Sequence, residues 1–171
     1  MSDASEELRS RQAPLKERYR DDAATAVIVL KASASLDAAG VACRVDTGRA
    51  LVEAGLHPAT GGSGLQVCSG DMLLEALAAC AGVTLRAVAT ALDIAVRDGR
   101  IEVEGDLDVR GTLGVSKDAP VGFRAIRLRF LIDTDATPEQ LATLLKLTER
   151  YCVVLQTLRT PAAVTATMAA T

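Results

Sequence analysis

One nearly uncharged stretch, residues 70–92 (GDMLLEALAACAGVTLRAVATAL), constrains the fold more than any other part of the chain. Its apolar and small residues recur at the spacing that lines one side of an α-helix. The pattern therefore predicts a long central helix with the Cys80 thiol on its buried side. We expect Ser69 as the N-cap and Asp71 as a first-turn carboxylate, where the helix dipole favours a negative charge. Arg86 interrupts the apolar run before the roughly twenty residues that a membrane span requires, so we expect no membrane span.

Alternation of apolar and polar residues on either side of this helix predicts β-strands. Residues 23–35 and 41–47 are expected to form a hairpin, and residues 101–113 and 124–132 a second strand pair with one buried face. The run Thr137-Pro138-Glu139-Gln140 is typical of a helix start, and that helix should extend to about Arg159 with Cys152 on its apolar side. Residues 163–169 alternate again and are expected to return to the sheet.

The resulting order, ββαββαβ, predicts an α+β fold in which an antiparallel sheet packs on two long helices. Residues 1–22 carry mixed charge with few apolar anchors, so we expect an N-terminal arm there and one domain over residues 23–171.

Composition argues against several classes of function. Aromatic residues make up 2% of the chain, tryptophan is absent and the net charge is −3, so no nucleic-acid partner is expected. The sequence shows no cleavable leader, which favours a cytoplasmic location. The four cysteines contain no closely spaced pair and His57 is the sole histidine, so we expect neither a metal site nor a bound cofactor.

Cys80 and Cys152 leave two interpretations open. Both thiols point inward from helices that share one sheet, so they are either small core residues or a redox pair, and a disulfide would need Cα atoms within about 7 Å. Cys68, in the loop before the central helix, is a possible competing thiol, and Cys43 is expected in the core of a strand. His57 either borders a pocket or is a turn residue bonded to the backbone.

The run SGDMLLEALAAC ending at Cys80, with Gly61 and Gly62 before it and RYCVV around Cys152, resembles the OsmC/Ohr family, in particular its less characterised OsmC-like branches. The resemblance implies an intertwined homodimer acting as a thiol peroxidase in the oxidative stress response. It implies that Cys80 attacks an organic hydroperoxide and becomes a sulfenic acid, which Cys152 resolves to a disulfide. An external dithiol, dihydrolipoamide-like, would then reduce the disulfide.

The chain differs from the family pattern near both cysteines. Ser69 replaces a proline, Asp71 stands where the family has glutamate, and Val153 replaces the proline that often follows the second cysteine. The family's reductases lower the thiol pKa with an arginine from the early strands, for which Arg44 and Arg49 are candidates. Asp71 and Arg44 are therefore possible supporting residues. A first-turn carboxylate that stabilises the helix also explains Asp71, and a solvent-exposed charge on a strand also explains Arg44.

These differences keep a second hypothesis in view, a noncatalytic small-molecule-binding or stress-associated module built on the same scaffold. A thiol hydrolase that uses Cys80 is disfavoured, because His57 has no evident way to act as its base.

Overall fold

The computed structural model describes residues 33–36, 42–46, 51–114 and 117–170, together with residues 6 and 10. The expected N-terminal arm, residues 1–22, lies outside the described residues except for residues 6 and 10. The first part of the expected hairpin, residues 23–32, also lies outside them. For residues 33–36 and 42–46 the description covers the backbone.

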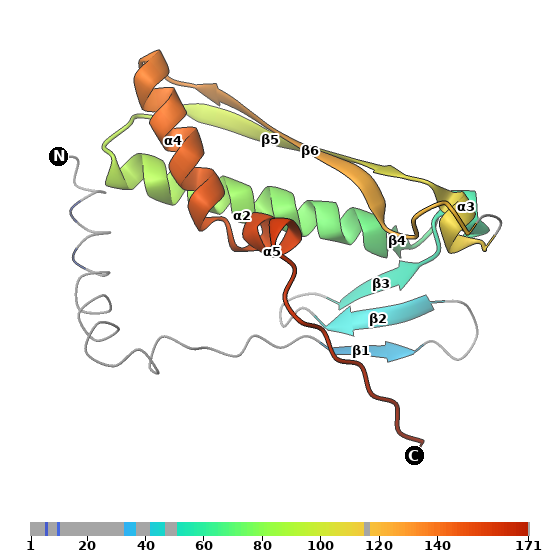
Figure 1. Cartoon of the computed structure of the whole chain (residues 1–171). Coiled ribbons are helices and arrows are strands. Elements are labelled where there is room, and N and C mark those ends of the chain that lie inside the picture. Colours follow the sequence, from blue (N-terminus) through green and yellow to red (C-terminus); the bar gives the residue numbers. More distant parts are fainter. Residues whose placement is uncertain are drawn as a thin grey trace.

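The long helix α2 (Ser69–Ala91) forms the axis of the molecule, with β5 and β6 along one side and α4 and α5 along another (Figure 1). The helix was predicted correctly, but its N-cap is Cys68 instead of Ser69. Cys68 keeps an extended backbone because it is also the last residue of the short strand β4 (Val67–Cys68), so Ser69 already belongs to the first turn. Asp71 lies in that first turn, as expected.

The strands β5 (Asp98–Leu107) and β6 (Phe123–Asp133) form an antiparallel pair over α2. Alternate residues of β6 are half-buried, including the expected Ile126, Leu128, Phe130 and Ile132. The first strand of the pair is shorter than predicted, since residues 109–112 form the helical turn α3 (Val109–Thr112). The Asp108 carboxylate accepts a hydrogen bond from the Arg110 N–H and so caps this turn, which ends the strand.

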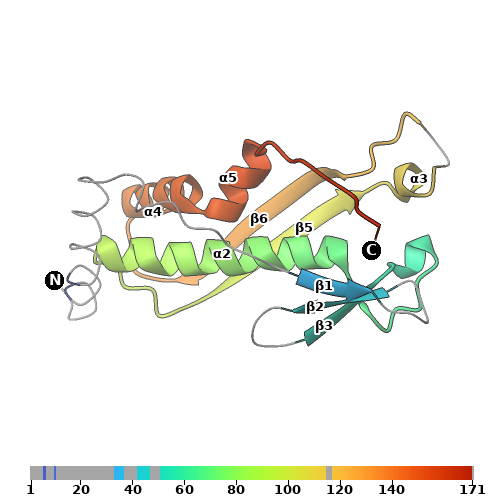
Figure 2. The same ribbon diagram turned by 90° about the horizontal axis from the view of Figure 1, so that it is seen from below.

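A second sheet has the order β1-β2-β3-β4 and lies beside the first turns of α2 (Figure 2). Strands β1 (Ser33–Leu36), β2 (Ala42–Asp46) and β3 (Leu51–Gly55) are antiparallel, whereas β3 pairs with β4 in parallel. The 3-10 turn η2 (Pro58–Thr60) lies in the loop between β3 and β4. The predicted α+β class and hairpin pairing are confirmed, but the described strands form two sheets and include β3, which was not predicted.

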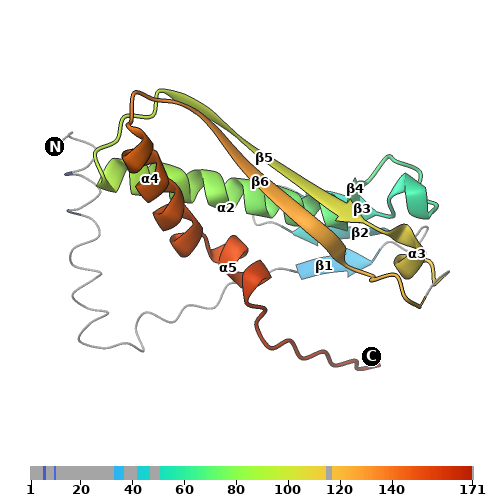
Figure 3. The same ribbon diagram turned by 45° about the horizontal axis from the view of Figure 1, so that its top comes forward.

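The last helical segment is interrupted at Cys152. Helix α4 (Pro138–Tyr151) begins with the predicted capping box, in which the Thr137 side chain and the Gln140 side chain each bond the other residue's backbone. At Cys152 the backbone is extended, with ψ 106°, and a separate helix, α5 (Val153–Arg159), follows in a new direction (Figure 3). The continuous helix predicted to Arg159 was therefore wrong.

Residues 161–170 form neither a helix nor a strand. The predicted strand over residues 163–169 was wrong for this chain, because the segment leaves the body of the molecule instead of meeting a strand edge (Figure 1). Val164 is 89% exposed and Met168 fully exposed, so the apolar side of the alternating pattern has no cover within the described residues.

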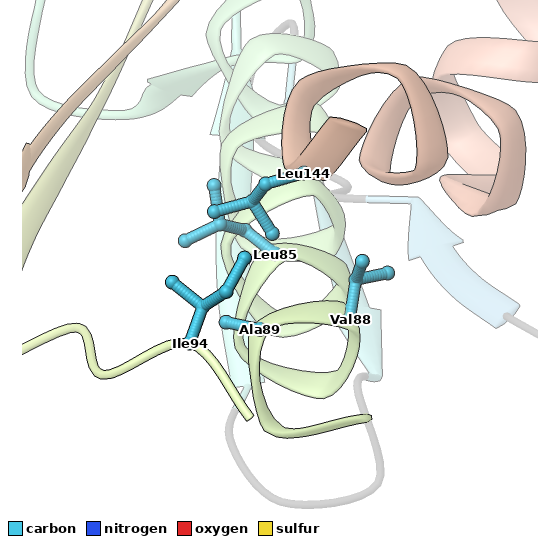
Figure 4. Packing of buried hydrophobic residues seen from close by; sticks show 5 residues of the cluster. All are labelled: Leu85, Val88, Ala89, Ile94 and Leu144. Carbon is cyan, nitrogen blue, oxygen red and sulfur yellow. The ribbon is translucent and has the colours of Figure 1, made fainter. Parts of the chain in front are cut away.

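The core consists of two groups of buried residues on α2. One group joins the end of α2 to α4 and to the loop that follows α2. It consists of Leu85, Val88, Ala89, Ile94 and Leu144 (Figure 4). The other group consists of Leu77, Ala81 and Cys152 and joins the middle of α2 to the α4–α5 junction. The second group, hereafter the thiol cluster, is the part of the core that bears chemistry.

Replacing Leu144, which is 1% exposed, with alanine should lower the free energy of unfolding by about 2–5 kcal/mol, because the packed α2–α4 contact loses its side chain. Urea unfolding at a fixed protein concentration measures the loss. Leu113→Ala, at a turn residue that is 53% exposed, should change the free energy by less than about 1 kcal/mol. Equal losses in the two variants would contradict the assignment of Leu144 to the core.

Candidate thiol site

The structure brings the two predicted cysteines together at the thiol cluster. Cys152 is fully buried against Leu77 and Ala81 of α2, and Cys80 packs against the same cluster. The two side chains are hydrogen-bonded to each other, and both are free thiols. The meeting follows from local structure: Cys80 lies at the middle of α2, and the break after Tyr151 places Cys152 over it.

The environment of Cys80 favours its thiolate. Burial raises the pKa of the thiol, but hydrogen bonds from the Val154 backbone N–H, the Cys152 side chain, Thr84 and the Val153 N–H outweigh burial. The net result is a Cys80 pKa below its ordinary value. Since the thiolate is the nucleophilic form of cysteine, this arrangement makes Cys80 the more reactive thiol of the pair.

The environment of Cys152 has the opposite effect. Burial raises the pKa of its thiol, and the neighbouring Cys80 raises it further because a second negative charge beside the first is unfavourable. Cys80 therefore ionises first while Cys152 keeps its proton and donates it in a hydrogen bond. The pair therefore favours a thiolate at Cys80 and a neutral thiol at Cys152.

Thr84, one turn after Cys80 on α2, is a further polar contact of the site. Its hydroxyl donates to the Cys80 carbonyl oxygen at 2.7 Å and lies within hydrogen-bonding reach of the Cys80 sulfur. Rotation about the Thr84 C–O bond can turn the same proton from the carbonyl to the ionised sulfur.

The predicted supporting residues are not brought to the thiols within the described part of the chain. Asp71 lies nine residues before Cys80 on one helix, which is about 13 Å along the axis. Arg44 lies on β2, paired with Glu53 of β3, and its side chain is outside the description, as is the whole of Arg49.

Two arginines on the cysteine helices are engaged elsewhere. Arg86 donates to the Val96 carbonyl, and the Arg150 guanidinium lies 5.6 Å from the centre of the Tyr151 ring. Among the described residues, the groups that lower the pKa of Cys80 are thus neutral donors and include no guanidinium.

Cys68 and His57 lie away from the pair. Cys68 is half-buried at the N-terminus of α2, about 18 Å along the helix axis from Cys80, so this chain does not offer it as a partner for that thiol. The Nδ1 atom of His57 accepts the Ala59 N–H at 3.0 Å and caps the turn η2, which agrees with the interpretation of a backbone-bonded turn residue. Cys43 lies on β2, and its side chain is outside the description.

A cavity of about 440 Å³ adjoins the thiol cluster between α2, β6, α4 and α5. Leu77 and Leu155 line this cavity and also contact the thiol cluster, so the cysteines lie close to its wall. Three charged side chains, Arg124, Glu149 and Arg159, contribute the polar part of the lining. The described residues contain no group of three or more side chains able to hold a metal ion.

Sequence patterns did not reveal the backbone donors of Val153 and Val154 or the contact of Thr84. A proline directly after Cys152 would have marked the first position of a new helix, because proline is favoured there. Valine occupies that position in this chain, so the break in the helix left no local signal.

One protein family matches most of the chain. The family model described as OsmC-like protein matches residues 62–167, whereas no curated protein matches the chain. An OsmC-like protein from Mycoplasma pneumoniae has a similar structure, with a TM-score of 0.66 and 18% identity over 78% of this chain and 89% of that one. The organic hydroperoxide resistance protein OsmC from Legionella pneumophila, described as a predicted redox protein, has a TM-score of 0.61 and 18% sequence identity. The match covers 78% of this chain and 91% of that one.

The organic hydroperoxide resistance protein OhrB of Bacillus subtilis gives a TM-score of 0.52 and 22% identity over 78% of this chain and 93% of that one. At these identities the similarity to solved structures shows the shared fold.

The unequal pKa values of the two thiols can be tested by alkylation. With iodoacetamide at pH 7, Cys80 should react faster than Cys152, because its lowered pKa leaves more thiolate and Cys152 is fully buried. The rate at Cys80 should rise with pH and reach half its maximum at a lower pH than for a cysteine whose pKa is ordinary. Peptide mass spectrometry reads the rates separately, and faster labelling of Cys152 would contradict the assignment.

Proposed function

Because the chain belongs to the OsmC-like family, we propose that it is a thiol-dependent peroxidase that reduces organic hydroperoxides through Cys80 and Cys152. The observation that carries the proposal is the pair itself. Two free thiols, one on α2 and one at the α4–α5 junction, share one cluster, and their surroundings lower the pKa of one and raise that of the other.

The proposed reaction uses each thiol once. The Cys80 thiolate attacks a peroxide oxygen, so an S–O bond forms, the O–O bond breaks, and the alkoxide leaves and takes up a proton to become an alcohol. Cys80 is then a sulfenic acid. The Cys152 sulfur attacks the Cys80 sulfur, and the hydroxyl leaves with the Cys152 proton as water. The cysteines lose two electrons in total, which the peroxide gains.

The cavity beside the thiol cluster supports an organic substrate. Aliphatic and phenylalanine side chains of α2, β6, α4 and α5 line it beside the three charged ones and offer contact to a hydrocarbon group. Because sulfenic acid is more stable against further oxidation away from solvent, the buried position of Cys152 beside Cys80 also suits a two-step reaction.

An external dithiol would complete the cycle, since the described residues offer no third thiol next to the pair. Exchange of a dihydrolipoamide-like dithiol with the Cys80–Cys152 disulfide would return both cysteines to thiols. A cytoplasmic location fits this cycle, because cysteines there are kept reduced.

We further propose that the working form is an intertwined homodimer. By length and composition, the helix α2 is apolar enough to cross a membrane. Only 28% of its most apolar 18-residue window is buried in the single chain, so most of this apolar surface is uncovered. Its exposed side carries Ala76, Ala79 and Val83, and the last of these is 73% exposed. A second copy that covers this face would bury the apolar surface, and the small side chains would let it approach closely.

A second candidate function has one observation in its favour. The donors at Cys80 are neutral, and within the described residues neither an arginine nor an acidic side chain contacts the thiol. A noncatalytic module that binds a small apolar molecule in the cavity of about 440 Å³ would need neither group.

Stoichiometric cumene hydroperoxide should oxidise two thiols per chain and leave a Cys80–Cys152 disulfide, because the sulfenic acid forms beside the neutral thiol of Cys152. Thiol titration and peptide mass spectrometry measure both results. Cys80→Ser should abolish rapid peroxide consumption, whereas Cys152→Ser should consume one equivalent and accumulate the sulfenic acid.

Cys68→Ser serves as the matched control and should behave like the unchanged chain, since that thiol lies at the far end of α2. Slow oxidation of all cysteines at similar rates would instead favour the binding module.

The homodimer proposal predicts that Val83→Glu lowers the molecular mass in solution from that of two chains to that of one. A buried glutamate at the centre of the exposed α2 face would have no partner charge, which opposes association. Sedimentation velocity measures the mass. Leu113→Glu makes the same change at an exposed turn residue and should leave the dimer intact. A single-chain mass for the unchanged protein would refute the proposal.

A further inference from the structure

The interruption between α4 and α5 releases the backbone amides beside Cys80. Since α4 ends at Tyr151 and α5 begins at Val153, the helical bond that would join the Val153 N–H to the Glu149 carbonyl is not made. The last bond of α4 runs from the Cys152 N–H to the Thr148 carbonyl at 3.0 Å. The Val153 and Val154 N–H groups lie at the start of a new helix, where intrahelical acceptors are absent, and both are directed to the Cys80 sulfur.

The Glu149 carbonyl that loses its helical donor gains another from a side chain. Gln156 Nε2 donates to this oxygen at 2.7 Å, across the break and seven residues along the chain. The contact is partly buried, so an unpaired carbonyl at this point would be costly. Without Gln156, the carbonyl could regain a donor if the chain straightened and the Val153 N–H returned to it, which would take that N–H away from Cys80.

We infer that Gln156 is a positioning residue for the Cys80 thiolate: its side-chain amide replaces the missing helical donor at Glu149 and so holds the chain open at Cys152. The biological use of this arrangement rests on the proposed function, but the inferred effect itself is on the ionisation of the Cys80 thiol. The Gln156 backbone N–H donates to the Cys152 carbonyl oxygen at 2.9 Å, and its side-chain amide acts on Cys80 through the backbone of Val153 and Val154. The Arg159–Glu149 ion pair at 2.9 Å uses the Glu149 carboxylate and leaves the carbonyl to Gln156.

The test is the pH profile of Cys80 alkylation by iodoacetamide in the full chain carrying Gln156→Met. Methionine matches glutamine in length and flexibility but has no N–H, so packing is kept while the donor is lost. The Cys80 profile should move to higher pH and the rate at pH 7 should fall about threefold to tenfold, as expected when hydrogen bonds to a charged group weaken. Peptide mass spectrometry assigns the rate to Cys80.

Gln156→Asn provides a second variant that keeps a polar amide but shortens the side chain by one methylene, so the amide no longer reaches Glu149. It should shift the profile in the same direction, which keeps the inference testable if Gln156→Met is too unstable to measure. Gln66→Met is the matched control, because Gln66 also donates its Nε2 proton to an oxygen, that of Glu53 at 2.9 Å, on an exposed surface. It should leave the profile unchanged.

An unshifted Cys80 profile in a folded Gln156 variant would overturn the inference. So would an equal shift in Gln66→Met, since the effect would then be general. Alkylation needs no peroxide and no reductant, so this result is independent of turnover. If the chain does not reduce peroxides but the Gln156 variants shift the profile, the proposed function is refuted and the role of Gln156 stands. If the chain reduces peroxides but the profile does not shift, the role of Gln156 is refuted and the proposed function stands.

Discussion

The contact of Cys152 with the middle of α2 is the interaction on which the site depends. Leu77 and Ala81 bury Cys152 completely, and this packing fixes where α4 stops and where α5 begins relative to Cys80. The small side chain of Ala81 matters here, because a larger one would hold the α4–α5 junction away from the helix. Hydrophobic packing therefore sets the geometry, and the polar contacts of the thiols follow from it.

Neutral groups create the asymmetry between the two thiols. Backbone N–H groups of Val153 and Val154 and the Thr84 hydroxyl surround Cys80, whereas Cys152 is fully buried and its remaining backbone donors do not offset that burial. Such an arrangement does not require a charged residue to be buried beside the thiol, which would carry its own desolvation cost. Burial outweighs the hydrogen-bond donors at Cys152, whereas the donors outweigh burial at Cys80, and this difference separates the two pKa values.

Sequence patterns predicted most of the fold, because α2, the β5–β6 pair and the capping box at Thr137 each have strong local signals. Both cysteines were also predicted on inward helix faces by periodicity, and the family resemblance implied their pairing. The break at Cys152 was not, since the apolar stripe continues through Val153 and Leu155 with no proline or glycine to end the helix. The donors at Cys80 were missed for the same reason, as backbone amides carry no residue signature. The strand predicted over residues 163–169 is absent. Alternation of apolar and polar residues indicates that a segment can form a strand, but not that another strand lies beside it to pair with.

A thiolate held by amide dipoles differs from one held by a guanidinium in its response to the medium. Mobile ions weaken the attraction between an exposed cation and a thiolate within a Debye length of about 8 Å at physiological ionic strength. Hydrogen bonds from Val153 and Val154 in a partly buried cluster are little affected by that screening, and amides do not titrate between acidic and alkaline pH. The reactivity of Cys80 should consequently be almost independent of salt.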